Sequence, residues 1–115
     1  MIGVDIEQIS RFENKDRIRD KKFLERIFTL SELEYCYSKK NFASSLCARF
    51  CAKEAVIKAL SSIGIKHAKL NDIEVFHGNN NEPHVKVAGA DDAEISISLS
   101  HDRVNAVAVA LIRKI

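Results

Sequence analysis

The chain has 115 residues, of which 46% are apolar and 30% are charged, a balance that is typical of a folded protein and excludes a disordered or collagen-like chain. This length suits one modest hydrophobic core, so we expect a single domain over residues 1–115. The formal net charge is only +2, yet residues 1–66 hold 13 Lys and Arg against 9 Asp and Glu, and residues 67–115 hold 5 against 7. A basic N-terminal half suits an anionic partner.

The first ten residues, MIGVDIEQIS, contain neither the basic segment nor the long apolar segment of an export signal, and no later stretch has the roughly 20 apolar residues of a membrane-spanning helix. We therefore expect a cytoplasmic protein without a membrane partner. The cysteines Cys36, Cys47 and Cys51 are odd in number and lack C-x-x-C spacing. This pattern favours buried free thiols, with a Cys47–Cys51 metal pair as the weaker alternative.

The N-terminal segment alternates strictly between apolar residues and Gly3, Asp5 and Glu7, which predicts a half-buried strand in which the two acids share one face. Apolar residues then recur at helical spacing from Ile9 to Phe28 but are interrupted by charged residues, so two short helices are expected there. The next helix is capped by Thr29 or Ser31 and ends near Ser38; the sequence SELE provides the acid of a capping box.

The strongest helical pattern runs from about residue 43 to residue 60, without Pro or Gly, and predicts the longest helix. The segments IEVF and HVKV, separated by HGNNNEP, predict two strands joined by a turn. Two further runs, EISISLS and AVAVALI, flank HDRVN and predict a closing antiparallel hairpin. This order predicts an α+β fold, in which the N-terminal strand and the helices pack on one face of an antiparallel sheet.

The long helix carries most of the candidate functional residues. Glu54 and Lys58 are four positions apart and therefore leave the same face of the helix, as do the like-charged Arg49 and Lys53. A phosphate between the two cations would relieve their repulsion. The simplest interpretation of Glu54 and Lys58 is an exposed salt bridge worth roughly 0.3–0.5 kcal/mol, but Asp5 gives them a possible third partner, because a carboxylate on an apolar strand is usually paired or metal-bound.

An Asp and a Glu that meet across a strand and a helix would suit Mg²⁺, which takes one or two protein carboxylates together with water and substrate phosphate. The His and Cys residues have no zinc-site spacing, and the chain contains no phosphate-binding glycine loop and no G-x-S-x-G. The segment around His101 and Asp102 permits four interpretations: a proton-transfer histidine, a phosphate-binding histidine, an Asx turn formed by Asp102, or a solvent-facing pair. The turn is favoured, and a Ser/His/Asp triad is disfavoured.

These motifs together resemble the holo-acyl-carrier-protein synthases, which are small bacterial members of the 4′-phosphopantetheinyl transferases. The resemblance runs nearly end to end and rests on the following segments: Gly3-Val4-Asp5-Ile6, Ile9, Arg11-Phe12, Phe28-Thr29, Ser31-Glu32-Leu33, Arg49-Phe50-Cys51-Ala52-Lys53-Glu54-Ala55, Lys58-Ala59, Ile73-Glu74-Val75, Pro83, Gly89 and Ile97-Ser98-Leu99-Ser100-His101. Gln8 stands where an acid is common in the family, and Glu82 stands in place of a lysine.

The resemblance implies a Mg²⁺-dependent transfer of 4′-phosphopantetheine from coenzyme A to a serine of apo-acyl carrier protein, in support of fatty acid biosynthesis. It makes Asp5 and Glu54 the metal ligands, and these two residues with Lys58 the catalytic group. It assigns Lys58 to the pyrophosphate of coenzyme A, and it assigns Arg49, Lys53 and His101 to coenzyme A phosphate binding or to the site of the neighbouring subunit. It assigns Arg11 to the carrier protein, to which we add the basic residues Arg17, Lys22 and Arg26. It also implies a homotrimer with active sites between subunits.

Two points stay open at this stage. The serine proton is accepted either by Glu54 or by a metal-bound water molecule. The competing functional class is a module that binds nucleic acid through the basic half. The absence of Trp, the low aromatic content of 7% and the near-neutral charge argue against that class, so we expect no nucleic-acid partner.

Overall fold

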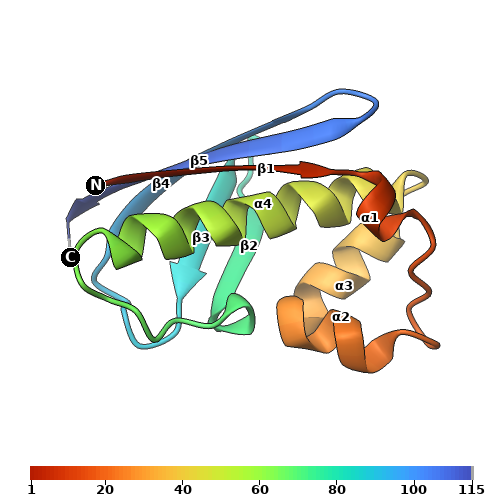
Figure 1. The fold of residues 1–115 in the computed structure, drawn as a ribbon, viewed down its shortest axis with the longest axis horizontal. Helices are drawn as coiled ribbons and strands as arrows, with labels where there is room; N and C mark the ends of the chain where they lie inside the picture. Colours follow the sequence, from red (N-terminus) through yellow and green to blue (C-terminus); the bar gives the residue numbers. More distant parts are fainter. Residues whose placement is uncertain (115) are drawn as a thin grey trace.

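The computed structural model describes residues 1–114, and the side chain of residue 114 lies outside the description. Five strands and four α-helices follow one another along the chain (Figure 1). In chain order these elements are β1 (Ile2–Gln8), α1 (Ser10–Glu13), α2 (Lys21–Ile27), α3 (Leu30–Tyr37), α4 (Phe42–Ser61), the 3₁₀ turn η1 (Leu70–Asp72), β2 (Ile73–His77), β3 (Pro83–Val87), β4 (Glu94–His101) and β5 (Asn105–Lys114). The expected helices, strands and closing hairpin are all present, which confirms the α+β fold.

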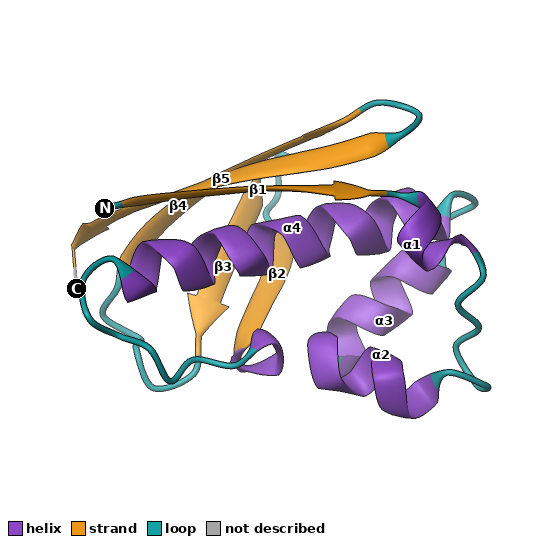
Figure 2. Cartoon of the chain, viewed as in Figure 1, coloured by secondary structure: helices purple, strands orange, loops and turns teal. Residues whose placement is uncertain are grey.

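The strands form a three-stranded sheet in the order β1-β5-β4 and a two-stranded sheet of β2 and β3, and all pairs are antiparallel. The N-terminal strand is therefore an edge strand of the sheet itself, whereas we expected it to pack on the sheet together with the helices. Helix α4 runs along one face of the three-stranded sheet. Helices α2 and α3 lie beneath the N-terminal half of α4 (Figures 1 and 2). Among residues 1–114, no helix lies on the opposite face of this sheet (Figure 1).

Helix α3 begins with a complete capping box. The Thr29 side chain accepts a hydrogen bond from the backbone N–H of Glu32, and the Glu32 carboxylate accepts one from the N–H of Thr29. Of the two predicted caps, Thr29 is thus the correct one. The three cysteines are free and buried, which confirms the prediction of buried thiols.

The interface between β1 and α4 is unusually close because small residues line it. A Cβ atom on Gly3 would lie 2.0 Å from the carbonyl oxygen of Ala55. On the neighbouring strand, the residues paired with Gly3, Asp5 and Glu7 are all alanines, namely Ala110, Ala108 and Ala106, and all three are buried. The helix therefore packs directly on the polar face of β1, and this contact positions the candidate site.

The apolar face of β1 points away from α4. Ile2, Val4 and Ile6 are 65%, 58% and 63% exposed. Their cross-strand partners are Leu111, Val109 and Val107. Beside these, β4 contributes Ser96, Ser98 and Ser100. The outer sheet face, as we call the surface formed by these nine residues, is thus an exposed apolar surface with one serine-lined margin, which is uncommon for a protein that works as a monomer.

Candidate active site

The first group of candidate residues, Asp5, Glu54 and Lys58, meets where β1 crosses α4. The Asp5 side chain is only 9% exposed, and its Oδ1 accepts a hydrogen bond from Lys58 Nζ over 3.0 Å. Lys58 Nζ also donates to the backbone oxygen of Val4 over 3.0 Å. Lys58 on α4 therefore forms its ion pair with Asp5 on β1, whereas the simplest interpretation of the sequence paired it with Glu54 on the same helix.

We call the cluster of Asp5, Glu7, Glu54 and Lys58 the acidic site. Its electrostatics show that the three carboxylates lie close together. Burial, and then the charge of Asp5, raise the pKa of Glu54. Burial, and then the close approach and charge of the Asp5 carboxyl, raise the pKa of Glu7. The hydrogen bond to Asp5 raises the pKa of Lys58. The second oxygen of Asp5, Oδ2, is buried and has no hydrogen-bond partner. A positive charge placed beside these oxygens would satisfy Oδ2 and relieve the repulsion between the acids.

A divalent cation with oxygen ligands fits this chemistry. Mg²⁺ prefers carboxylate oxygens and takes one or two of them from a protein, and Asp5 and Glu54 provide two from neighbouring elements. Among residues 1–114, no three His, Cys, Asp or Glu side chains stand in the arrangement of a preformed metal centre. The acidic site therefore offers ligands that still have to turn toward the cation.

The second group lies around Arg49, on a different face of α4. The Arg49 residue is 3% exposed; its guanidinium stacks 4.2 Å from the centre of the Tyr35 ring and hydrogen bonds to Nδ1 of His77 over 3.0 Å. Its Nε is buried without a partner, as is the hydroxyl of Ser44. Burial and the Arg49 charge lower the pKa of His77.

These residues line a groove of about 320 Å³, which we call the arginine groove. Its lining also includes His101 and Lys39, so Arg49 and His101, two of the residues that the resemblance assigns to coenzyme A binding, line the same groove. His77, Lys39 and Tyr35 are additions that sequence reasoning missed. Asp102 forms the Asx turn that we favoured, since its Oδ1 accepts hydrogen bonds from the N–H groups of Val104 and Asn105, each over 2.8 Å.

Lys53 occupies a position that does not fit its predicted contact with a coenzyme A phosphate. Its side chain is 0% exposed and forms an ion pair with the equally buried Glu32. Its Nζ also donates to the backbone oxygens of Leu70 and Ile73. Burial lowers the pKa of Lys53, and the Glu32 carboxylate acts in the opposite sense. The repulsion between Arg49 and Lys53 is thus resolved by a protein carboxylate, without a phosphate.

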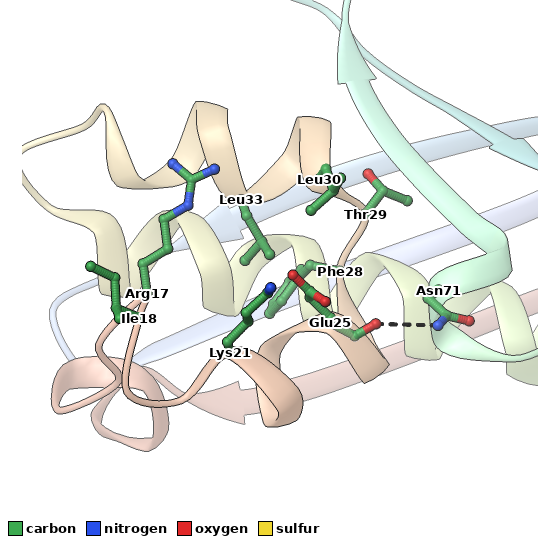
Figure 3. A pocket seen from close by; sticks show the side chains of 9 residues that line it. All are labelled: Arg17, Ile18, Lys21, Glu25, Phe28, Thr29, Leu30, Leu33 and Asn71. Carbon is green, nitrogen blue, oxygen red and sulfur yellow. Dashed lines mark hydrogen bonds between the residues drawn. The ribbon is translucent and has the colours of Figure 1, made fainter.

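The four residues predicted to contact a carrier protein are all exposed: Arg11, Arg17, Lys22 and Arg26. Arg11 lies next to the acidic site, where its guanidinium pairs with Glu7 over 2.9 Å and stacks 4.7 Å from the centre of the Phe50 ring. Arg17 lines a separate groove between α2 and α3, into which Lys21 also faces (Figure 3).

Comparisons with known proteins agree with this architecture. The family model described as "4'-phosphopantetheinyl transferase superfamily" matches residues 1–112, and the chain belongs to that superfamily. It is 39% identical over 120 residues to the holo-[acyl-carrier-protein] synthase of Clostridium tetani, which covers 96% of this chain and 93% of that protein. The relatives thus place the chain, within the superfamily, among the holo-[acyl-carrier-protein] synthases.

Two solved structures show the same fold. The Helicobacter pylori holo-[acyl-carrier-protein] synthase, crystallised with coenzyme A, has a TM-score of 0.81 and 32% identity, covering 97% of this chain and 99% of that chain. The Bacillus anthracis enzyme, also in complex with coenzyme A, has a TM-score of 0.79 and 30% identity, covering 96% and 93%. Within residues 1–114, no helix is long and apolar enough to cross a membrane.

Proposed function

We propose that this chain is a Mg²⁺-dependent holo-[acyl-carrier-protein] synthase that transfers 4′-phosphopantetheine from coenzyme A to a serine of apo-acyl carrier protein. The observation that carries the mechanism is the meeting of Asp5, Glu54 and Lys58, with a buried and unpartnered carboxylate oxygen at its centre. Membership of the superfamily and the coenzyme A complexes of the structural relatives support the choice of substrate.

In this reaction the serine oxygen attacks the β-phosphorus of coenzyme A, forms a new P–O bond and expels adenosine 3′,5′-bisphosphate. Catalysis of phosphoryl-type transfer depends mainly on positioning and on charge neutralisation. Asp5 and Glu54 would hold the cation, which would supply Lewis-acid stabilisation of the pyrophosphate charge. Lys58, which is 53% exposed, has its ammonium group at the edge of the acidic site and neutralises the departing phosphate. The candidate acceptor of the serine proton is Glu54 or a water molecule at the cation site.

The arginine groove suits the remaining phosphate of coenzyme A. Arg49 is held between Tyr35 and His77, and its unpartnered Nε provides a donor for an anion. His77, whose pKa is lowered by burial and by Arg49, would gain a proton more readily once a phosphate neutralised its surroundings. His101 completes this wall of the groove.

One chain does not bring the two phosphate-binding groups to a common cleft. Glu54 and Arg49 are five positions apart on α4, so at about 100° per residue they leave the helix in directions roughly 140° apart. Asp5 lies on β1 and His101 on β4, and these strands are the two opposite edges of the three-stranded sheet. One coenzyme A molecule could reach both groups where the β1 edge of one chain meets the β4 edge of another.

We therefore propose a homotrimer with its active sites between subunits. The outer sheet face provides an apolar surface that a partner copy would cover, because Ile2, Val4 and Ile6 lie more than half exposed on it. Two different edges that meet around a three-fold axis make a heterologous interface that closes into a ring. Light scattering on the purified protein tests the assembly, and a monomer at micromolar concentration would contradict it.

The carrier protein is proposed to dock on the basic surface between the acidic site and α2. Arg11 borders the acidic site. Arg17, in the segment before α2, and Lys22 and Arg26, on α2, extend the positive charge. Between α2 and α3 lies a groove of about 810 Å³, where Ile18 and Leu30 are 86% and 66% exposed and offer apolar contacts beside Lys21 (Figure 3). An acidic carrier with an apolar stripe would match this surface.

The decisive experiment is incubation with coenzyme A, Mg²⁺ and apo-acyl carrier protein, followed by mass spectrometry of the carrier. We expect the carrier to gain the mass of phosphopantetheine, and we expect Asp5→Asn and Glu54→Gln to abolish the gain while the melting temperature stays within a few degrees of the parent. Lys58→Ala should lower kcat more than it raises KM. Full activity of both acid variants would remove the metal model. The cytoplasmic location and the link to fatty acid biosynthesis follow from this proposed activity.

A further inference from the structure

The buried ion pair of Glu32 on α3 and Lys53 on α4 has all its hydrogen bonds satisfied. Both side chains are 0% exposed, and neither residue lines the arginine groove. The Glu32 carboxylate also accepts hydrogen bonds from the backbone N–H groups of Thr29 and Val75, over 2.9 and 2.8 Å. An ammonium group has three protons to donate, and Lys53 gives the other two to backbone oxygens in η1 and at the start of β2.

Stability alone does not explain two charges at this place. A buried ion pair loses the hydration of both groups, and an apolar pair of similar volume is often as stable. What the ion pair adds is direction, because each of its hydrogen bonds requires a particular distance and angle between the groups that it joins. These bonds join α3, α4 and β2 at one point, so they fix how the three elements are placed relative to one another.

The same three elements form the arginine groove. On α3, Tyr35 follows the glutamate of the ion pair by three positions, and on α4, Arg49 precedes the lysine by four positions. On β2, His77 follows Val75 by two positions. Such spacings place side chains on the same face of a helix or of a strand. The ion pair therefore lies about one helical turn from the groove, on the faces that carry its walls.

We infer that the Glu32–Lys53 ion pair positions the walls of the arginine groove, so that Arg49 meets a phosphate in a fixed orientation. This inference rests on the proposed function, which supplies coenzyme A as the ligand of the groove. The Arg49 guanidinium stacks 4.2 Å from the centre of the Tyr35 ring and hydrogen bonds to His77 over 3.0 Å. Both partners belong to other elements, so a shift of α3 or β2 would turn the guanidinium away.

The first measurement is the steady-state kinetics of the transfer reaction. The double variant Glu32→Met/Lys53→Met removes both charges together and leaves no unpaired charge in the core. We expect its KM for coenzyme A to rise about tenfold with kcat within about twofold of the parent, since a misplacement of about 1 Å can cost up to about 100-fold and the ion pair does not contact the acidic site. Dephospho-coenzyme A, which lacks the 3′-phosphate, is the comparison substrate. The variant should lose most of the parent's preference for coenzyme A.

The second measurement needs neither coenzyme A nor a carrier protein. It is the titration of the His77 imidazole by nuclear magnetic resonance, with His77→Gln to assign the signal. Burial and the charges of Arg49 and Lys39 lower the pKa of His77, and His84 acts in the same sense, whereas Glu82 raises it. If the ion pair holds these groups together, the double variant should move the pKa of His77 toward its ordinary value of 6.5.

Leu60→Ala is the control for a loss of stability alone. Leu60 is 1% exposed on α4 and lies about two turns from Lys53, and its truncation leaves a cavity in the core. It should lower the melting temperature without changing the KM for coenzyme A or the pKa of His77. Should the double variant fail to fold, Glu32→Asp carries the test, because it keeps the charge but shortens the side chain. It should change both quantities in the same direction by a smaller factor.

The outcomes separate this inference from the proposed function. A folded double variant that keeps the parent's KM and the parent's His77 titration would refute the positioning role, as would equal changes in Leu60→Ala. A moved His77 pKa with an unchanged KM would support the positioning role and exclude the groove as a coenzyme A site. A parent that transfers nothing to the carrier would refute the proposed function, and the titration of His77 would still decide whether the ion pair positions the groove.

Discussion

Substitution of Gly3 by Ala should separate β1 from α4 and so disrupt the acidic site without touching any of its charged groups. The added carbon would lie 2.0 Å from the carbonyl oxygen of Ala55 and 2.8 Å from the backbone nitrogen of Ala59, where non-bonded carbon atoms need about 3.5 Å. Both contacts are with helix backbone, which cannot rotate away. The strand and the helix must therefore move apart by about 1 Å or more.

The expected cost follows from this displacement. Overpacking of a core costs about 1–3 kcal/mol, and we expect the upper end of this range because backbone atoms are involved. At roughly 4 °C per kcal/mol for a domain of this size, the melting temperature should fall by roughly 10–15 °C. Asp5 lies two residues beyond Gly3 and would move away from Glu54, and a misplacement of about 1 Å can cost about 100-fold in rate.

The assay combines thermal unfolding by circular dichroism with the transfer reaction, measured well below the variant's melting temperature. Gly78→Ala is the matched control, because there the added carbon would meet only the end of the flexible Glu82 side chain. If Gly3→Ala melted within about 2 °C of Gly78→Ala and kept full activity, the close packing of β1 on α4 would not be what positions Asp5.

Three further perturbations test other contacts. Lys53→Met leaves the buried Glu32 without its cation and should lower the free energy of unfolding in urea by about 3–5 kcal/mol. Lys58→Met, at a half-exposed lysine, should lower it by less than about 1 kcal/mol. Equal losses in the two variants would refute the argument from burial. Burial and the charge of Asp5 raise the pKa of Glu54 above its ordinary value of 4.5. In EDTA, the favourable contribution of Glu54 to the free energy of unfolding is therefore complete at lower pH and is lost as the pH rises through the raised pKa. Glu54→Gln should flatten the resulting decline in melting temperature, and parallel pH profiles of the variant and the parent would contradict this prediction. Ile6→Asp should dissociate the proposed homotrimer in light scattering, whereas Ile18→Asp, on α2's side of the molecule, should leave the mass unchanged from the parent. An unchanged mass for Ile6→Asp would exclude the outer sheet face as the interface.

The sequence predicts the elements of this fold well because each has a strong local signal. The long helix α4 follows from about five turns of regular apolar spacing without Pro or Gly, and the final hairpin follows from alternation on both sides of a turn. The alternation in β1 also predicts correctly that Asp5 and Glu7 share a face. It does not predict which face meets the helix, since that depends on the alanines that β5 places beside Gly3.

The site is less predictable because its pairings are long-range. Asp5 and Lys58 meet across 53 positions of sequence. The residue pattern alone left this contact as one interpretation beside an exposed Glu54–Lys58 salt bridge, and the resemblance to a family favoured it. The prediction for Lys53 failed for the same reason. Its i,i+4 relation to Arg49 is local, whereas the carboxylate that neutralises it, Glu32, comes from another helix. Similarly, His77 reaches Arg49 only because β2 packs beside α4, and no signal around residue 77 indicates this.

A single period-2 pattern in β1 therefore serves two purposes. Odd-numbered positions place Gly3, Asp5 and Glu7 against α4, and even-numbered positions place the apolar residues on the outer sheet face. If that face is the subunit interface, the proposed metal ligand Asp5 and the contacts of assembly lie on the same strand, one residue apart. A shift of register by one residue would exchange the two faces, burying branched side chains where α4 has room only for glycine and placing Asp5 in the interface. The register of β1 therefore determines both the acidic site and the outer sheet face on which we propose that a partner copy binds.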